Sequence, residues 1–254
     1  YDITDPGSAE FVNYINSRDF SVVTGADDSP EGLCFIPGSD GSSAMLLAAC
    51  EVGGTVAAYE ITGAQSDNLI KIYFTNDVHC AYENYARTAS IVEDNDLLID
   101  AGDNIQGDII GTISDGGYMV DIMNYMGYDA AVPGNHEFDY GMDRFFEIAK
   151  GSETAPKLAN YDYLSCNFRD IKTNMTLLDP YKIYNAEGKK VAVIGISTPE
   201  TLTKSNPAYF KNEAGEWIYD FSNDTTGELL YSAVQTAVDD AKEEGADYII
   251  AVGH

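Results

Sequence analysis

The hydrophobic positions follow two different patterns along the chain. Up to about residue 63, short apolar runs alternate with turn-forming clusters of Pro, Gly, Ser and Asp, and helical spacing is absent. Several short strands at close spacing predict an all-β unit. The expected strands cover residues 11–15, 33–36, 45–50 and 55–61. We therefore interpret residues 1–63 as a β-rich segment.

After a polar linker at residues 64–68, buried strands alternate with amphipathic helices. This alternation predicts a layered α/β domain over residues 69–254. The expected strands lie at about 69–75, 97–101, 128–132, 163–166, 191–196 and 247–252. The expected helices lie at about 82–93, 117–126, 141–150 and 226–244.

Polar side chains follow four of these apolar runs. They occupy residues 76–79, 100–104, 134–139 and 253–254, and they include all 3 histidines of the chain. None of these histidines is predicted to lie on a helix. In α/β folds the ends of the strands form the rim where ligands bind. The sequence therefore predicts one site built from several strand ends.

The residue types at these strand ends favour metal binding. Because side chains alternate along an extended chain, Asp77 and His79 are expected to point to the same side. Asp103, Asn135 and His254 offer a carboxylate, an amide oxygen and an imidazole from three other strand ends. Such mixed ligands suit divalent ions such as zinc or manganese, and not a closed structural zinc site. Two ions sharing Asp103 would lie roughly 3.5–4 Å apart.

Composition narrows the classes of partner. The formal net charge of -28 excludes the basic footprint that nucleic-acid binding requires. No apolar run reaches the roughly 18 residues that indicate a membrane span. The acidic composition favours an exposed, extracellular location. An anionic substrate would then require bound cations that reverse the local field.

The four cysteines do not form a metal-binding or redox motif, because no CxxC spacing occurs. Buried free thiols are the default expectation. Cys34 and Cys50 would face each other if their strands are neighbours in a suitable register. Cys80 follows His79 directly, so we expect its thiol close to the site without binding metal.

Taken together, the strand-end motifs resemble those of the calcineurin-like metallophosphoesterases. They read Asp77-x-His79, Gly102-Asp103-Asn104-x-Gln106-Gly107, Gly134-Asn135-His136-Glu137-Phe138-Asp139 and Gly253-His254. Gln106-Gly107 and Phe138-Asp139-Tyr140-Gly141 are similar to the 5'-nucleotidase branch, which includes UDP-sugar hydrolases and 2',3'-cyclic-nucleotide phosphodiesterases. The resemblance implies a layered α/β/β/α sandwich over residues 69–254. Residues 29–33 and 51–56 resemble the last blade of a propeller-like domain; the alternative is a β-rich extension that packs on the next domain.

The resemblance also implies a role for each site residue. Asp77 and His79 would bind the first metal, Asp103 would bridge both metals, and Asn135 and His254 would bind the second.

Two further residues are implied to act on the substrate and not on the metals. His136 would lie over the phosphate, stabilise the transition state and assist the leaving group. Asp139 would orient His136 and stabilise its charge.

The function implied is hydrolysis of nucleotide phosphate esters by in-line attack of a metal-bound hydroxide. Alternatives are cyclic-nucleotide phosphodiesterase or UDP-sugar hydrolase activity, or a catalytically incomplete binding or surface module. Family members carry further metal ligands after the position of His254 and a C-terminal substrate-binding domain. We therefore expect this chain to be a segment of a longer, secreted or cell-surface protein of bacterial type.

Overall fold

The computed structural model describes residues 30–36, 44–50, 55–61, 70–93, 96–152 and 155–254. The chain divides into two compact units, with the boundary between Asp67 and Asn68. Among the described helices, none combines the length and apolar character that crossing a bilayer requires.

The first unit contains a three-stranded antiparallel sheet in the order β1-β2-β3. Its strands are β1 (Pro30–Ile36), β2 (Ala44–Cys50) and β3 (Thr55–Ile61). The fourth expected strand, at 11–15, lies outside the described residues, and the propeller-like interpretation stays a prediction. Sequence left open whether Cys34 and Cys50 face each other; they do not, because the register pairs Cys34 with Leu47 and Cys50 with Pro30.

The second unit begins with a parallel sheet in the order β4-β5-β6-β7. Its strands are β4 (Ile72–Thr75), β5 (Leu97–Asp100), β6 (Ala130–Ala131) and β7 (Asp162–Tyr163). All four residues of β5 are buried, as expected for a parallel strand covered on both faces. The parallel order brings the carboxyl ends of these strands to one edge of the sheet.

A second sheet has the order β12-β10-β9. Strand β10 (Lys189–Ile196) pairs antiparallel with β9 (Tyr181–Ala186) and parallel with β12 (Tyr248–Gly253). Sequence analysis did not predict β9. A small sheet pairs β8 (Arg169–Asp170) with β11 (Tyr219–Asp220).

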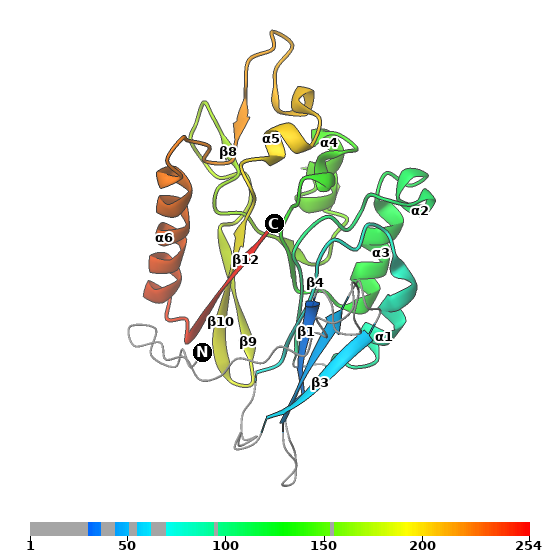
Figure 1. The fold of residues 1–254 in the computed structure, drawn as a ribbon. Coiled ribbons are helices and arrows are strands. Elements are labelled where there is room, and N and C mark those ends of the chain that lie inside the picture. Colours follow the sequence, from blue (N-terminus) through cyan, green and yellow to red (C-terminus); the bar gives the residue numbers. More distant parts are fainter. Residues whose placement is uncertain (1–29, 37–43, 51–54, 62–69, 94–95, 153–154) are drawn as a thin grey trace, which may run out of the picture. The chain divides into compact units, whose positions relative to one another are not determined.

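The two larger sheets pack face to face through apolar side chains. Leu97 and Ile99 of β5 lie in one buried cluster with Val191 and Val193 of β10. On the outer face of the second sheet, helix α6 (Glu228–Glu243) packs Ala233 and other small residues against β10. Helices α6 and α3 (Gly117–Met126) lie on opposite sides of the two sheets (Figure 1). The expected α/β/β/α layering is therefore present in this unit.

The remaining helices are short. They are α1 (Tyr85–Ala89), α2 (Ile109–Thr112), α4 (Met142–Ala149) and α5 (Thr201–Lys204), with single turns η2 (Tyr82–Asn84), η3 (His136–Phe138) and η4 (Pro207–Phe210). The expected helix at 117–126 is confirmed as α3. The expected helix at 82–93 is too long, because β-branched residues at 91 and 92, which have low helix propensity, follow α1.

Candidate metal centre

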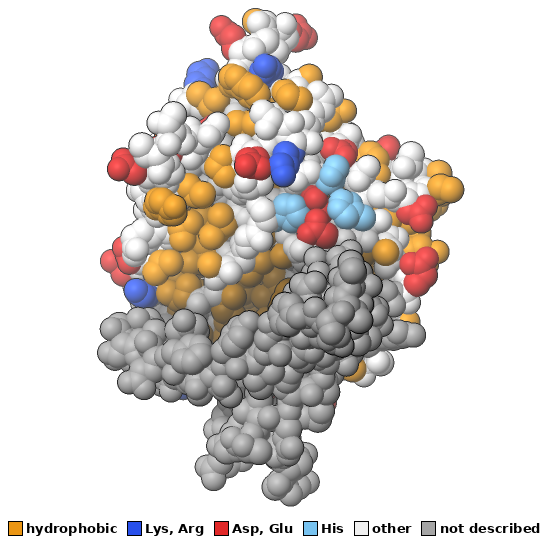
Figure 2. Space-filling view, in the orientation of Figure 1, with side chains coloured by type: hydrophobic (Ala, Val, Ile, Leu, Met, Phe, Trp, Pro, Cys, Tyr) orange, Lys and Arg blue, Asp and Glu red, His pale blue; other side chains and the backbone are white. Residues whose placement is uncertain are grey.

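The loops after four strands carry the predicted ligands. Asp77 and His79 follow β4, Asp103 follows β5, and Asn135 follows β6, all at one edge of the first sheet. His254 follows β12 and therefore reaches the site from the second sheet. In Figure 2 the histidine side chains gather around a small group of acidic side chains.

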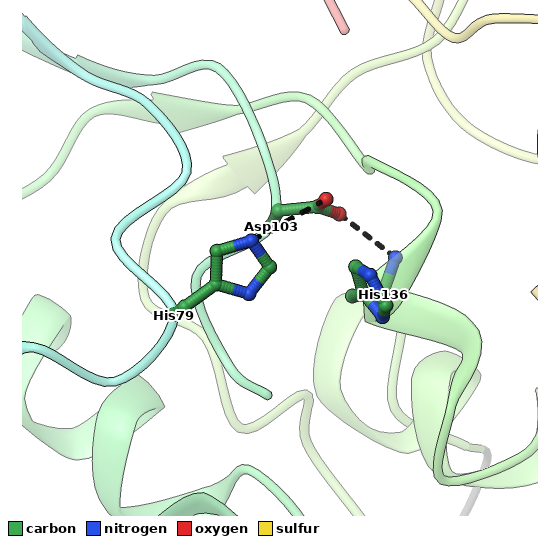
Figure 3. A group of neighbouring side chains, drawn as sticks. All are labelled: His79, Asp103 and His136. Atoms are coloured by element: carbon green, nitrogen blue, oxygen red, sulfur yellow. Dashed lines mark hydrogen bonds and ion pairs between the residues drawn. The ribbon is translucent and has the colours of Figure 1, made fainter. Parts of the chain in front are cut away.

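Asp103 lies at the centre of this group and is only 3% exposed. Its Oδ2 is 3.1 Å from Nε2 of His254 and 3.9 Å from Nε2 of His79. Its Oδ1 accepts a 2.8 Å hydrogen bond from the backbone N–H of His136. Asp77 Oδ1 lies 3.6 Å from Nε2 of His79. Figure 3 shows the Asp103 carboxylate between His79 and His136.

The backbone that carries Asp77 and His79 differs from the prediction. The residues are not on an extended chain, because both adopt left-handed φ angles, 50° and 46°. Their N–H groups donate to the carbonyl oxygens of Gly102 and Asp103, each at 3.0 Å. A hydrogen-bonded turn thus brings the two side chains together. Non-glycine residues adopt such angles only where the surrounding structure holds them.

Two imidazoles are held so that Nε2 faces the site. Nδ1 of His79 lies 3.1 Å from the carbonyl oxygen of Gln106, and Nδ1 of His254 lies 2.9 Å from that of Ala101. A carbonyl accepts only from a protonated nitrogen, so Nδ1 carries the hydrogen in both rings. This second contact is typical of histidines that bind metal through the opposite nitrogen.

The charges of Asp103 and His254 depend on the contact between these two side chains. Burial by itself would raise the pKa of Asp103, but hydrogen bonds from His254 and the His136 backbone lower it. The hydrogen bond to Asp103 raises the pKa of His254 to about 9. In the absence of a cation, His254 is therefore an imidazolium at neutral pH. A divalent ion would replace that proton.

The donor set fits divalent ions. Asp77, Asp103 and His254 offer ligand atoms that all lie within 4.8 Å of one another, and so do His79, Asp103 and His136. The two trios share Asp103, as a bridging carboxylate between two ions would require. By distance alone His136 qualifies as a ligand, in contrast to its predicted role.

Asn135 is buried, with 8% of its surface exposed. It stands at the N-cap position of η3, yet its side chain makes no capping hydrogen bond. An Asn at this position would ordinarily cap the turn. Its predicted role as an oxygen ligand to the second ion stays a prediction.

His136 forms a second functional pair with Asp139. Its Nδ1 lies 2.6 Å from Oδ2 of Asp139, and the His136 side chain is 33% exposed. Burial would lower the pKa of His136, but the contact with Asp139 and the neighbouring acids raise it. The hydroxyl of Ser205 donates to the other oxygen of Asp139 at 3.2 Å. Contrary to expectation, His136 lies on a helical turn, η3.

Aromatic packing holds that turn in place. Phe138 is fully buried, and its ring lies 4.6 to 5.7 Å from four other rings, measured between centroids. These rings are Phe145, Phe168, Phe210 and Phe221. Because Phe138 sits between His136 and Asp139 in the chain, its packing fixes both ends of the pair.

Sequence analysis assigned no role to two buried acidic residues behind the site. Asp100, 1% exposed, accepts hydrogen bonds from Thr75 and Asn104, and burial raises its pKa to about 7. Glu137, also 1% exposed, accepts three backbone hydrogen bonds. Both lie inside the strand-end motifs, but nothing in the sequence distinguishes them from the acids predicted to bind metal. Cys80 is fully buried as a free thiol and contacts Asn104.

Comparison with known proteins identifies similar chains. Residues 70–254 match the calcineurin-like phosphoesterase family. The chain is 33% identical to a snake venom 5'-nucleotidase of Gloydius brevicauda, over 71% of this chain and 34% of that protein. It is 30% identical to a 5'-nucleotidase of Diplobatis ommata, over 84% of this chain and 37% of that protein. The chain thus spans about a third of the length of these relatives.

Solved structures share the fold. The calcineurin-like phosphoesterase YfkN from Bacillus subtilis has a TM-score of 0.55 and 25% sequence identity, covering 73% of this chain and 61% of that one. A 5'-nucleotidase precursor from Thermus thermophilus has a TM-score of 0.55 and 24% identity, covering 73% of this chain and 37% of that one.

Proposed function

The chain belongs to the calcineurin-like phosphoesterase family, and from this premise we propose that it hydrolyses phosphate esters with the help of two divalent metal ions. The observation that carries the proposal is the position of Asp103, whose Oδ2 faces the Nε2 atoms of two histidines. When bound, the ions would supply positive charge that polarises a phosphoryl group and acidifies water.

We assign the ligands as the family resemblance implies, whereas by distance alone Asp77 groups with His254 and His79 groups with His136 around Asp103. Asp77 and His79 would hold one ion, Asn135 and His254 the other, and Asp103 both. The backbone carbonyls behind His79 and His254 keep Nε2 available for an ion. Zinc and manganese both suit this mixture of oxygen and nitrogen.

His136 acts on the substrate in this proposal. Its Nδ1 donates to Asp139, which leaves Nε2 to face a phosphoryl oxygen or the leaving group. Because its pKa is raised, His136 holds a proton more readily than a free imidazole. That proton can stabilise the charge of the transferring group or protonate the departing oxygen.

Nucleotides are the substrate class we propose. Several relatives are named 5'-nucleotidases, and one, 27% identical, is named a trifunctional nucleotide phosphoesterase from Bacillus subtilis. The longer relatives are also the reason to propose a C-terminal substrate-binding domain and further metal ligands in the whole protein. Secretion stays a prediction from the acidic composition.

A phosphate-release assay tests the proposal. The chain is incubated with Mn²⁺ or Zn²⁺ and AMP, UDP-glucose or 2',3'-cyclic AMP, and phosphate is measured directly or, for the last two, after phosphatase treatment of the products. We expect metal-dependent release that EDTA abolishes, highest with AMP. Release that is greatest with UDP-glucose or the cyclic nucleotide would favour those activities instead. Absence of turnover of any substrate by the protein extended past His254, with two ions bound, would overturn the hydrolase and favour a binding module.

A further inference from the structure

Glu137 is a buried carboxylate with an unusual set of partners. It is 1% exposed, and among the described residues no Lys or Arg forms an ion pair with it. Instead it accepts three backbone hydrogen bonds. Oε2 accepts from Asp103 at 2.9 Å and from Gly134 at 2.7 Å, and Oε1 accepts from Asn104 at 2.9 Å. A buried charge is tolerated only when such bonds satisfy it.

These donors belong to two separate loops, the β5 loop (residues 101–107) and the β6 loop (residues 133–135). A single oxygen of Glu137 accepts one N–H from each loop. The loops themselves are in close contact. A Cβ atom added to Gly134 would lie 2.3 Å from Oδ1 of Asp103, and one added to Gly102 would lie 2.7 Å from the Gly134 nitrogen.

The β5 loop is strained where it meets Glu137. Asp103 adopts a left-handed φ of 57°, which a residue with a side chain occupies at a cost of roughly 1–3 kcal/mol. Glu137 binds the amides of Asp103 and of the next residue, Asn104. It therefore holds both peptide groups around the strained position.

We propose that Glu137 is a positioning residue that fixes the spacing between Asp103 and Asn135, and with it the pair of metal positions. Asp103 lies in the β5 loop and Asn135 in the β6 loop, so the distance between them is set by whatever joins the two loops. This inference rests on the proposed function, because the spacing between Asp103 and Asn135 matters only if two ions bind there. In this proposal Glu137 itself contacts neither metal nor substrate.

A carboxylate is required by this geometry. Both oxygens of Glu137 accept from backbone N–H groups. Glu137→Gln would not test this, because its single oxygen could take the position of Oε2 and keep both bonds that join the loops. A Glu137→Met variant keeps the approximate size of the side chain but offers no acceptor oxygen, so it removes all three bonds and with them the joint between the loops.

Mn²⁺ titration followed by electron paramagnetic resonance tests the role, because two Mn²⁺ ions that share a ligand give a spin-coupled spectrum. We expect the wild-type chain to bind two coupled ions. Glu137→Met should bind the second ion at least tenfold more weakly and lose most of the coupled signal. Phe138→Leu is the matched control: it is equally buried in the same turn, and its side chain packs among aromatic rings. It should lower the melting temperature while retaining two coupled ions.

The outcomes separate the two proposals. A wild-type chain that binds no coupled pair overturns the proposed function and this inference with it. A wild-type chain that binds a pair, together with a Glu137→Met variant that binds it equally well, overturns only the role of Glu137. If Phe138→Leu loses as much metal as the Glu137 variant at an equal loss of stability, the metal loss results from general destabilisation of the turn. That result also overturns the role of Glu137.

Hydrogen exchange on the wild-type chain tests the role even if Glu137→Met does not fold. The amides of Asp103, Asn104 and Gly134 should exchange slowly in EDTA, because Glu137 binds them before any ion arrives. Slow exchange that appears only after Zn²⁺ is added would show that the ions arrange the loops, and the inference would be wrong.

Discussion

At the scale of single residues, Asp103 and His136 lie side by side, yet we assign them different tasks. Asp103→Ala removes the carboxylate shared by both trios, so the variant should lose both ions and all turnover. His136→Ala should retain two ions and lose about 100-fold or more in kcat, since proton transfer typically contributes 10²–10⁴-fold. Metal content after gel filtration and steady-state kinetics measure these effects. Loss of an ion from His136→Ala would instead make His136 a ligand, as the second trio allows.

Asp139 acts through His136. Asp139→Asn keeps the shape of the side chain but weakens the contact with Nδ1 of His136, which now measures 2.6 Å. We expect kcat to fall by about 10–100-fold with unchanged metal content, as for other outer partners of functional histidines. Ser205→Ala, which removes the neutral partner of Asp139, should have the smaller effect. A larger loss of kcat in Ser205→Ala than in Asp139→Asn would contradict this order.

The His254–Asp103 pair makes the metal-free protein sensitive to pH. The pKa of His254 is raised from 6.5 to about 9 in the folded state, so folding strengthens proton binding. Its contribution to the free energy of unfolding, up to about 3 kcal/mol, is fully present below the ordinary pKa and is lost as pH rises through 9. Urea unfolding in EDTA between pH 6 and 10 measures it. His254→Gln should flatten the dependence, and an equal slope in both proteins would refute the assignment.

The residue types and order along the chain sufficed to predict that Asp77, His79, Asp103 and His254 lie close together, whereas their roles stay predictions. The local geometry of Asp77 and His79 was not predictable, because their left-handed backbone depends on hydrogen bonds to the β5 loop. Glu137 was also assigned no role. Its partners are backbone amides, which every residue possesses, so sequence carries no sign of which carboxylate will find them.

At the scale of elements, β10 approaches the end of β7 without a side chain between them. A Cβ atom on Gly195 would lie 2.1 Å from the carbonyl oxygen of Leu164. Gly195→Ala should therefore force the backbones apart and lower the free energy of unfolding by about 1–3 kcal/mol, as other overpacked cores do.

A second glycine provides the control for this prediction. Gly253 lies on β12, which pairs with β10, and its added Cβ would make an ordinary contact of 3.6 Å with Ile196. Urea unfolding should show little loss for Gly253→Ala. Equal losses for both variants would mean that the approach of β10 to Leu164 is not the cause.

Strong periodicity predicted the elements that the fold buries deeply. Strand β5 is buried along its whole length, and helix α3 buries one apolar face that includes Met119 and Met123, so both follow their apolar patterns closely. Strand β9 escaped prediction because its residues are mostly half-exposed, with polar side chains among the apolar ones. Such a strand depends on pairing with β10, which local sequence does not encode.

At the scale of the whole molecule, the metal centre links two sheets. Ligands that bind the folded state alone stabilise it by mass action, by about 2.7 kcal/mol at 100 times the dissociation constant. We expect Mn²⁺ or Zn²⁺ to raise the melting temperature and EDTA to reverse the shift. Asp103→Ala should show no such rise. A metal-induced rise that persists in Asp103→Ala would place the stabilising ions on other acidic groups of this strongly acidic chain.

Composition showed that the chain is acidic and has enough apolar residues to form a core. It did not predict how the chain divides into domains. The change from β-rich to βαβ pattern near residue 63 lies close to the division into two compact units. The linker and the role of the first unit stay predictions, since they depend on residues 1–29 and 62–69, which lie outside the described part.

His254 is joined to Ala101 by a hydrogen bond across 153 positions of sequence. The order of synthesis on the ribosome therefore matters. A growing polypeptide that has emerged only as far as β7 presents Asp77, His79, Asp103 and Asn135 but lacks the imidazole of His254. If the proposed ligand assignment holds, the second ion can be held only after β12 has docked beside β10. Nascent chains stalled before β12 should accordingly exchange Mn²⁺ freely with the medium, whereas released chains should retain it.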